Sequence, residues 1–143
     1  MRQIRKLFSV TPRERLLLAR TTLLVVAVRV ALWTLPLAYL RRSLSRRRTA
    51  APELAAFPVR RLAWAIGVAA RRIPCATCLT QALALQWLLA RAGRESCVCI
   101  GVAMKAAGGL ESHAWIECRG EIVIGDNGEL HRYSPILLLS TES

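Results

Sequence analysis

Polar and apolar positions follow a helical period along the first part of the chain and alternate after Gly93. The first helix has a clear start, with Thr11 as N-cap, Pro12 at the first helical position and Glu14 able to close a capping box. Apolar residues then continue from Arg13 to Leu35, and Pro36 should end or kink the segment. This pattern predicts a long N-terminal helix.

Two further helices are predicted before the period changes. One runs to Arg72 from about Glu53 or Pro58, with apolar residues at helical spacing. The other begins at Thr77 as N-cap, ends at Arg91 or Ala92, and is apolar on nearly every side, so we expect it in the core.

The remainder of the chain alternates with a period of two. This alternation predicts four strands, at residues 96–103, 113–119, 121–125 and 130–138. Turns that contain glycine join them. Helices first and strands last indicate an α+β fold with an antiparallel β-meander.

Charge and composition suggest where the domain is divided. Arg41 to Arg48 carries five positive charges in eight residues and precedes Thr49-Ala50-Ala51-Pro52, which indicates an exposed linker. We therefore expect a helical extension with a basic lead-in and linker at residues 1–52, and a core domain at 53–143.

The whole chain has 143 residues, 54% hydrophobic residues and a net charge of +12, nearly all of it from arginine. This composition excludes disorder. Nucleic acid is not expected as a partner, because the arginines are dispersed without aromatic platforms. An arginine-rich proteome explains the charge, while acidic peptides or an acidic partner protein remain open.

The N-terminal helix is nearly long enough to span a membrane. Arg20 and Arg29 interrupt its apolar sequence, and a central arginine costs roughly 2.5 to 3.5 kcal/mol on insertion scales. Burial against the domain is the favoured interpretation, with contact to a membrane surface or a partner left open.

The cysteines indicate a cytoplasmic protein with free thiols, because their number is odd, at five, and no secretory signal is present. Cys75 and Cys78 form a C-x-x-C, and Cys97 and Cys99 form a C-x-C. Structural zinc usually requires paired C-x-x-C hooks, so we interpret Cys97, Cys99 and Cys118 as core residues. The predicted chemistry uses no metal and no cofactor.

Cys78 is the candidate nucleophile. It follows the Thr77 cap, where unpaired amides and the helix dipole stabilise a thiolate and can hold an oxyanion. His113 is the candidate base, on a strand that places Trp115 and Glu117 on its side.

The base needs an acceptor for its second nitrogen, and Asp126 is the candidate because a turn at Gly120 returns it level with His113. Asn127 and Glu129 are alternatives for the acid. His131 is an alternative base, although its neighbours indicate a surface or edge strand.

Four segments together resemble the transglutaminase-like leader peptidases of lasso peptide biosynthesis: Cys78-Leu79-Thr80-Gln81-Ala82-Leu83-Ala84, Leu88-Leu89-Ala90-Arg91-Ala92-Gly93, Ile100-Gly101-Val102 and His113-Ala114-Trp115-Ile116-Glu117. The resemblance extends more loosely over the N-terminal helices. It implies a papain/transglutaminase-like fold and a triad of Cys78, His113 and Asp126.

The resemblance also implies a function. Such a cysteine protease removes the leader from a ribosomally made precursor before a separate cyclase closes the macrolactam ring. The chain begins directly with its helix, so it resembles the split form, which needs a separate winged-helix leader-recognition protein and can contact the cyclase.

One position departs from papain-like enzymes, which carry an oxyanion-hole glutamine before the nucleophile. Here that position is near Arg72, so the second oxyanion donor is unassigned. The rival hypothesis is a basic helical adaptor that binds an acidic partner or a membrane surface without catalysis.

Overall fold

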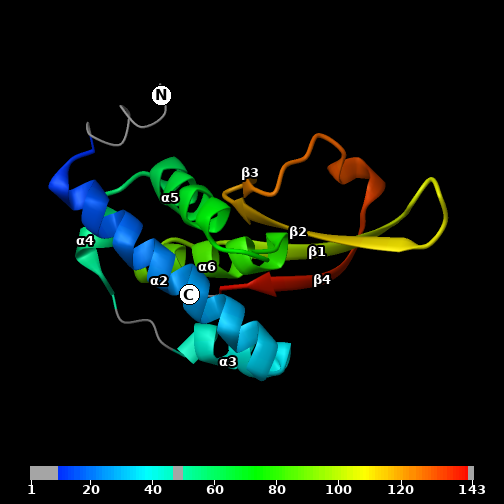
Figure 1. The fold of residues 1–143 in the computed structure, drawn as a ribbon, viewed down its shortest axis with the longest axis horizontal. Helices are drawn as coiled ribbons and strands as arrows, with labels where there is room; N and C mark the ends of the chain where they lie inside the picture. Colours follow the sequence, from blue (N-terminus) through cyan, green and yellow to red (C-terminus); the bar gives the residue numbers. More distant parts are fainter. Residues whose placement is uncertain (1–9, 47–49, 142–143) are drawn as a thin grey trace.

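The computed structural model describes residues 10–46 and 50–141 and confirms the α+β class, with helices followed by a four-stranded antiparallel sheet (Figure 1). The predicted basic lead-in at 1–8 lies outside the described residues, as do Arg47 and Arg48. The helices are α2 (Pro12–Thr34), α3 (Leu37–Arg46), α4 (Pro52–Ala55), α5 (Val59–Arg72) and α6 (Cys78–Arg91). The strands are β1 (Cys97–Met104), β2 (Leu110–Cys118), β3 (Glu121–Ile124) and β4 (Ser134–Ser140), with a 3-10 turn, η1 (Leu130–Arg132), before β4.

The start of α2 is the predicted capping box. The Glu14 amide donates to Thr11 Oγ1 at 3.3 Å, and the Thr11 amide donates to Glu14 Oε2 at 2.9 Å. The helix ends before Pro36, as expected from the proline.

Two predicted segments differ from the structure. The basic stretch expected to be a linker from Arg41 begins as helix, because α3 continues to Arg46. Of the two starts predicted for the second helix, the one at Pro58 is confirmed, since Pro58 is the N-cap of α5. The start at Glu53 is wrong, because Pro58 cannot donate the backbone hydrogen bond that would join α5 to the separate helix α4.

The helices form the layer that covers the sheet. α2 packs on α5 and α6, and α6 contacts β1 and β2. Leucine, valine and isoleucine side chains from α2, α5, α6 and the sheet share one core, which includes Val25, Leu62, Ile66, Leu83, Leu89, Val98, Ile116 and Leu139. Leu17 and Val28 also belong to it, so the N-terminal helix and the segment after residue 53 are built around the same core.

The strands are ordered β3-β2-β1-β4. The first three form consecutive hairpins, as a meander requires, but β4 pairs with β1 and leaves β3 at an edge. The last strand begins and ends later than the predicted range of 130–138. Residues 130–132 form η1, and the strand runs from Ser134 to Ser140. Buried Gln86 of α6 holds β4 in this position by donating to the Leu139 carbonyl at 2.5 Å.

Candidate active site

Cys78 is the first residue of α6, as the sequence predicts. Thr77 is the N-cap, and its Oγ1 accepts a hydrogen bond from the Thr80 amide at 3.3 Å and lies 3.0 Å from the buried Thr80 hydroxyl. Cys78 is a free, partly buried thiol that packs against the core. The cap and the enclosed helix therefore hold the thiol in a defined place.

The first turn of α6 also offers hydrogen-bond donors. Within residues 10–46 and 50–141, the amides of Cys78 and Leu79 have no acceptor, because the cap serves Thr80 and the Thr77 carbonyl serves Gln81. Free amides at a helix start can stabilise a negative charge on a thiolate or on a reacting carbonyl oxygen. This turn can therefore act as an oxyanion hole.

His113 lies on β2 opposite Gly101 of β1. Its Nε2 is 2.6 Å from the carbonyl oxygen of Gly125, and because a carbonyl can only accept, Nε2 carries the proton. Nδ1 is then the nitrogen with the lone pair in the neutral ring. The carbonyl thus fixes the tautomer and leaves Nδ1 as the atom that can take a proton from a nucleophile.

The backbone of Gly125 is suited to this role. It has φ of +90°, and a Cβ at this position would lie 2.6 Å from the Ala114 oxygen and 2.8 Å from Trp115 Cα. Only glycine allows both the backbone angle and this approach to β2. Sequence reasoning missed Gly125 as a site residue, although a glycine directly before the predicted acid was an available signal.

Two aromatic rings surround the imidazole. The ring centroids of Tyr133 and Trp115 are 5.4 Å and 6.3 Å from that of His113. Gly101 makes room for them, since a Cβ there would come within 2.9 Å of Tyr133 Cβ and 3.0 Å of the Trp115 ring. Sequence reasoning did not find Tyr133, because its approach depends on how the segment after β3 crosses the sheet.

Asp126 follows the residue that orients His113, and its carboxylate is engaged locally. Asp126 Oδ1 accepts from the Gly128 amide at 2.9 Å, and Asn127 Oδ1 accepts from the Glu129 amide at 3.0 Å. The acceptor for His113 is therefore a backbone carbonyl, and a role for the Asp126 carboxylate stays a prediction.

Arg132 holds this segment on the sheet. It pairs with Glu129 at 2.7 Å and with Glu111 of β2 at 3.3 Å, and donates to the Met104 carbonyl at 3.2 Å. The hydrogen bond that the guanidinium donates to Glu129 raises the pKa of Arg132. The alternative base His131 lies beside it in η1 and is exposed.

The two principal residues stand on elements in contact with each other. Ala114 and Ile116 belong to the core beneath the helices, so the alternation of β2 places His113 and Trp115 on the other face. Trp115 Nε1 donates to Glu117 Oε1 at 3.1 Å, in agreement with the predicted face. In the described part of the chain, no hydrogen bond joins the Cys78 thiol to His113. Their pairing stays a prediction.

The other cysteines are separate from this arrangement. Cys75 is exposed and has φ of +62° in the turn before α6. Burial, followed by the charges of Cys97 and Glu117, raises the pKa of the Cys99 thiol to about 12, so Cys99 remains protonated. Within the described part of the chain, no three His, Cys, Asp or Glu side chains are grouped to hold a metal ion.

A groove of about 610 Å³ lies between α5 and the edge strand β3. Its walls combine basic, aromatic and apolar side chains, among them Arg60, Trp64, Arg119 and Ile122. β3 leads directly to Gly125, so this groove follows the strand that ends at the acceptor of His113.

Comparison with known proteins identifies one family. The sequence profile of the transglutaminase-like superfamily matches residues 22–138, a range that includes α6 and the whole of β1, β2 and β3. Searches of curated proteins and of solved structures returned no match.

Proposed function

The chain belongs to the transglutaminase-like superfamily, and on that premise we propose that it is a cysteine peptidase that removes the leader from a ribosomally made lasso peptide precursor before macrolactam cyclisation. Proteins of this superfamily are typically cysteine peptidases or transglutaminases. In this proposal a separate winged-helix protein binds the leader, the reaction is cytoplasmic, and the lasso cyclase takes the product.

One observation carries the proposal: Cys78 is the capped first residue of a buried helix, and the described residues provide no acceptor for its own amide or for that of Leu79. A thiolate in this place is stabilised by the helix start, and the oxyanion formed by its attack meets the same amides. Leader specificity and the recognition protein come from the resemblance of residues 78–84, 88–93, 100–102 and 113–117 to leader peptidases.

The proposed reaction has two stages. Cys78 Sγ forms a bond to the scissile carbonyl carbon, the C–N bond breaks, and the departing amine takes the proton that His113 Nδ1 received from the thiol. Water then attacks the thioester carbon and gives a proton to His113, the C–S bond breaks to release the leader as its carboxylic acid, and His113 returns its proton to the Cys78 sulfur. The alternation of β2 directs His113 to the sheet face away from α6, so this chemistry requires His113 to come within hydrogen-bond reach of Cys78 in the reacting complex.

The groove between α5 and β3 supports a peptide substrate. Its volume of about 610 Å³ is in the range of ligand sites. As an edge strand, β3 offers an unpaired backbone to an extended peptide. The groove walls carry two arginines, Arg60 and Arg119, against one carboxylate, Glu121, and this balance favours acidic side chains.

The decisive experiment combines precursor, leader-recognition protein and this chain, and follows cleavage by mass spectrometry. We expect Cys78→Ala and His113→Ala to abolish cleavage and Cys75→Ala to retain it, because Cys75 is exposed and lies outside the helix. Cleavage by Cys78→Ala would exclude the peptidase and favour the adaptor hypothesis.

A further inference from the structure

One side of α2 exposes a continuous row of apolar side chains. They recur every three or four residues and comprise Leu16, Ala19, Leu23, Val26, Val30 and Trp33. Leu23 is 72% exposed and Trp33 81%, whereas Val25 and Thr21 on the opposite side are fully buried. Residues with this spacing share one face of a helix, so the row forms a single strip, here called the α2 strip.

Arginines border the α2 strip on both sides. By helical spacing, Arg15 and Arg29 follow one edge, and Arg13 and Arg20 follow the other. Glu14 is the only acidic residue from 10 to 46, and it is already bound to Arg61 and to its own cap at Thr11. Arg20 also pairs with Glu53 at 3.2 Å, so the borders of the strip carry an excess of positive charge but not basic side chains alone.

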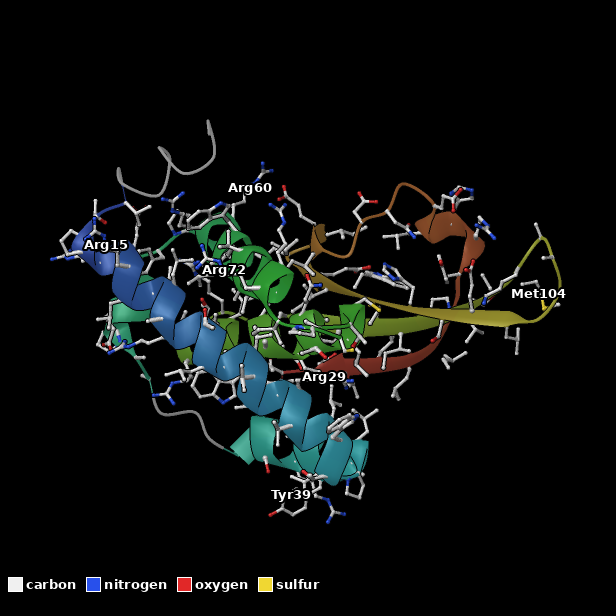
Figure 2. The ribbon with its side chains drawn as sticks, viewed as in Figure 1. Arg15, Arg29, Tyr39, Arg60, Arg72 and Met104 are labelled. Atoms are coloured by element: carbon white, nitrogen blue, oxygen red, sulfur yellow. The ribbon has the colours of Figure 1, made fainter. Side chains whose placement is uncertain are left out.

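Aromatic residues lie at the end of the α2 strip. The Arg29 guanidinium lies 5.4 Å from the centre of the Trp33 ring, and Tyr39 of α3 is also exposed. Figure 2 shows Arg15 and Arg29 well apart along α2, and Tyr39 pointing away from the protein below α3. Tryptophan, tyrosine and arginine beside apolar residues are typical of segments at the membrane interface.

The position of α2 favours contact with a membrane surface. The helix is long and apolar enough to cross a membrane by length and composition, but Leu17 and Val25 on its other side are packed in the domain core. A second copy fits poorly, because arginines at both edges would meet arginines. A membrane with anionic headgroups above an apolar interior can bind both parts of this surface: the headgroups pair with the arginines, and the interior accepts the apolar side chains.

We propose that the α2 strip binds an anionic lipid surface, with its apolar side chains among the acyl chains and its arginines at the headgroups. α2 packs on α5 and α6, and α6 contacts the sheet, so the strip lies on the far side of the helices from β2. Binding there leaves His113 and the groove beside β3 accessible.

The test is sedimentation of the full chain with vesicles of phosphatidylglycerol and phosphatidylcholine, against vesicles of phosphatidylcholine alone. We expect binding to the anionic vesicles that weakens as salt is raised. The double substitution Leu23→Asp/Val30→Asp should weaken binding roughly 100-fold or more, because two apolar side chains no longer insert.

Ile136→Asp/Leu138→Asp is the matched control, since it adds the same charge at exposed apolar positions on β4. This variant should bind nearly as the wild type. Trp33 emission should shift to shorter wavelength with anionic vesicles, and the shift should disappear in Trp33→Phe.

Absence of binding to anionic vesicles at low salt would overturn the proposal, and the strip would then fit an acidic protein. Equal weakening by both double variants would also overturn it, because net charge alone would then explain binding. Peptide cleavage does not enter this measurement, so its outcome is independent of the proposed peptidase activity.

Discussion

Helices α2 and α6 are both rich in leucine and alanine, and both begin at a threonine cap, yet their surroundings differ. Leu83, Leu85 and Leu89 of α6 are buried between the other helices and the sheet, whereas Leu23, Val30 and Trp33 of α2 face solvent. α6 is enclosed, and α2 is covered on one side only. Apolar composition therefore predicts that a helix buries part of its surface, but the position of the helix in the layer determines how much of that surface is buried.

The difference matters for function. An enclosed helix holds its first turn in one place, which suits a nucleophile and an oxyanion hole. A helix covered on one side keeps a large apolar surface for interaction, which suits docking. The enclosed helix carries Cys78, and the half-covered helix carries the α2 strip.

The largest expected contrast between the helices is in core packing. Leu83→Ala should lower the free energy of unfolding by about 2 to 5 kcal/mol, because it leaves a cavity at a site with 1% exposure. The matched Leu23→Ala should change it by about 0.5 kcal/mol or less. Urea unfolding measures both, and an equal loss would show that α2 is covered on its outer side.

Gly125→Ala tests whether the position of His113 depends on the close approach of the Gly125 backbone to β2. The added Cβ would meet the Ala114 oxygen and Trp115, so the Gly125 carbonyl should move away from His113. We expect cleavage kcat to fall about tenfold or more, as for a misplaced catalytic group.

Gly128→Ala is the control, because Gly128 also has positive φ, at +76°, but no atom within 4 Å of an added Cβ. It should lower stability through backbone strain and leave kcat nearly unchanged. A similar kcat for the two variants would remove Gly125 as the residue that positions His113.

The two threonine caps allow a smaller and direct comparison. Thr77→Ala and Thr11→Ala should each lower the free energy of unfolding by about 1 kcal/mol, since each removes a side-chain acceptor from a helix start. Only Thr77→Ala should slow alkylation of Cys78 by iodoacetamide. Equal alkylation rates in both variants would contradict a role for the cap in holding the thiol.

The smallest effect concerns alkaline pH. Burial raises the pKa of Cys99 to about 12 in the folded protein, so above the unfolded pKa of about 8.5 the unfolded state loses a proton that the native state keeps. Stability should therefore fall as pH rises from about 9 to 11.

Cys99→Ala should make the free energy of unfolding, measured with urea, fall less steeply as pH rises. Cys75→Ala, at an exposed position, should leave this pH dependence unchanged. An unchanged slope in Cys99→Ala would show that other groups cause the alkaline loss.

Local patterns predicted much of the fold because their causes lie within a few residues. The cap and proline at 11–12 begin α2, Thr77 begins α6, and alternation defines β2 with His113 and Trp115 on one face. The strand order could not be predicted in this way. β4 passes β3 and pairs with β1, and nothing in residues 134–140 indicates which edge they join.

The candidate site shows the same division. The sequence predicted Cys78 at the helix start and His113 on its strand, but it assigned the acceptor of His113 to a side chain. In the structure the acceptor is the backbone carbonyl of Gly125. Every residue has such a carbonyl, so the glycine before the predicted acid was the one local signal, and the contact itself depends on how β3 pairs with β2. The nearby Tyr133 ring was missed for a related reason, since its position depends on the crossing from β3 to β4.

The sequence by itself determined where helices and strands begin, which cysteine is a helix-start thiol and which family the chain resembles. These features depend on capping, periodicity and spacing, which act over one or two turns of chain. Only the tertiary structure decided which apolar surfaces are covered, which backbone group orients His113 and that the apolar α2 strip stays exposed. Those outcomes depend on contacts between segments far apart in sequence, because burial and hydrogen bonding are completed only when the layers pack.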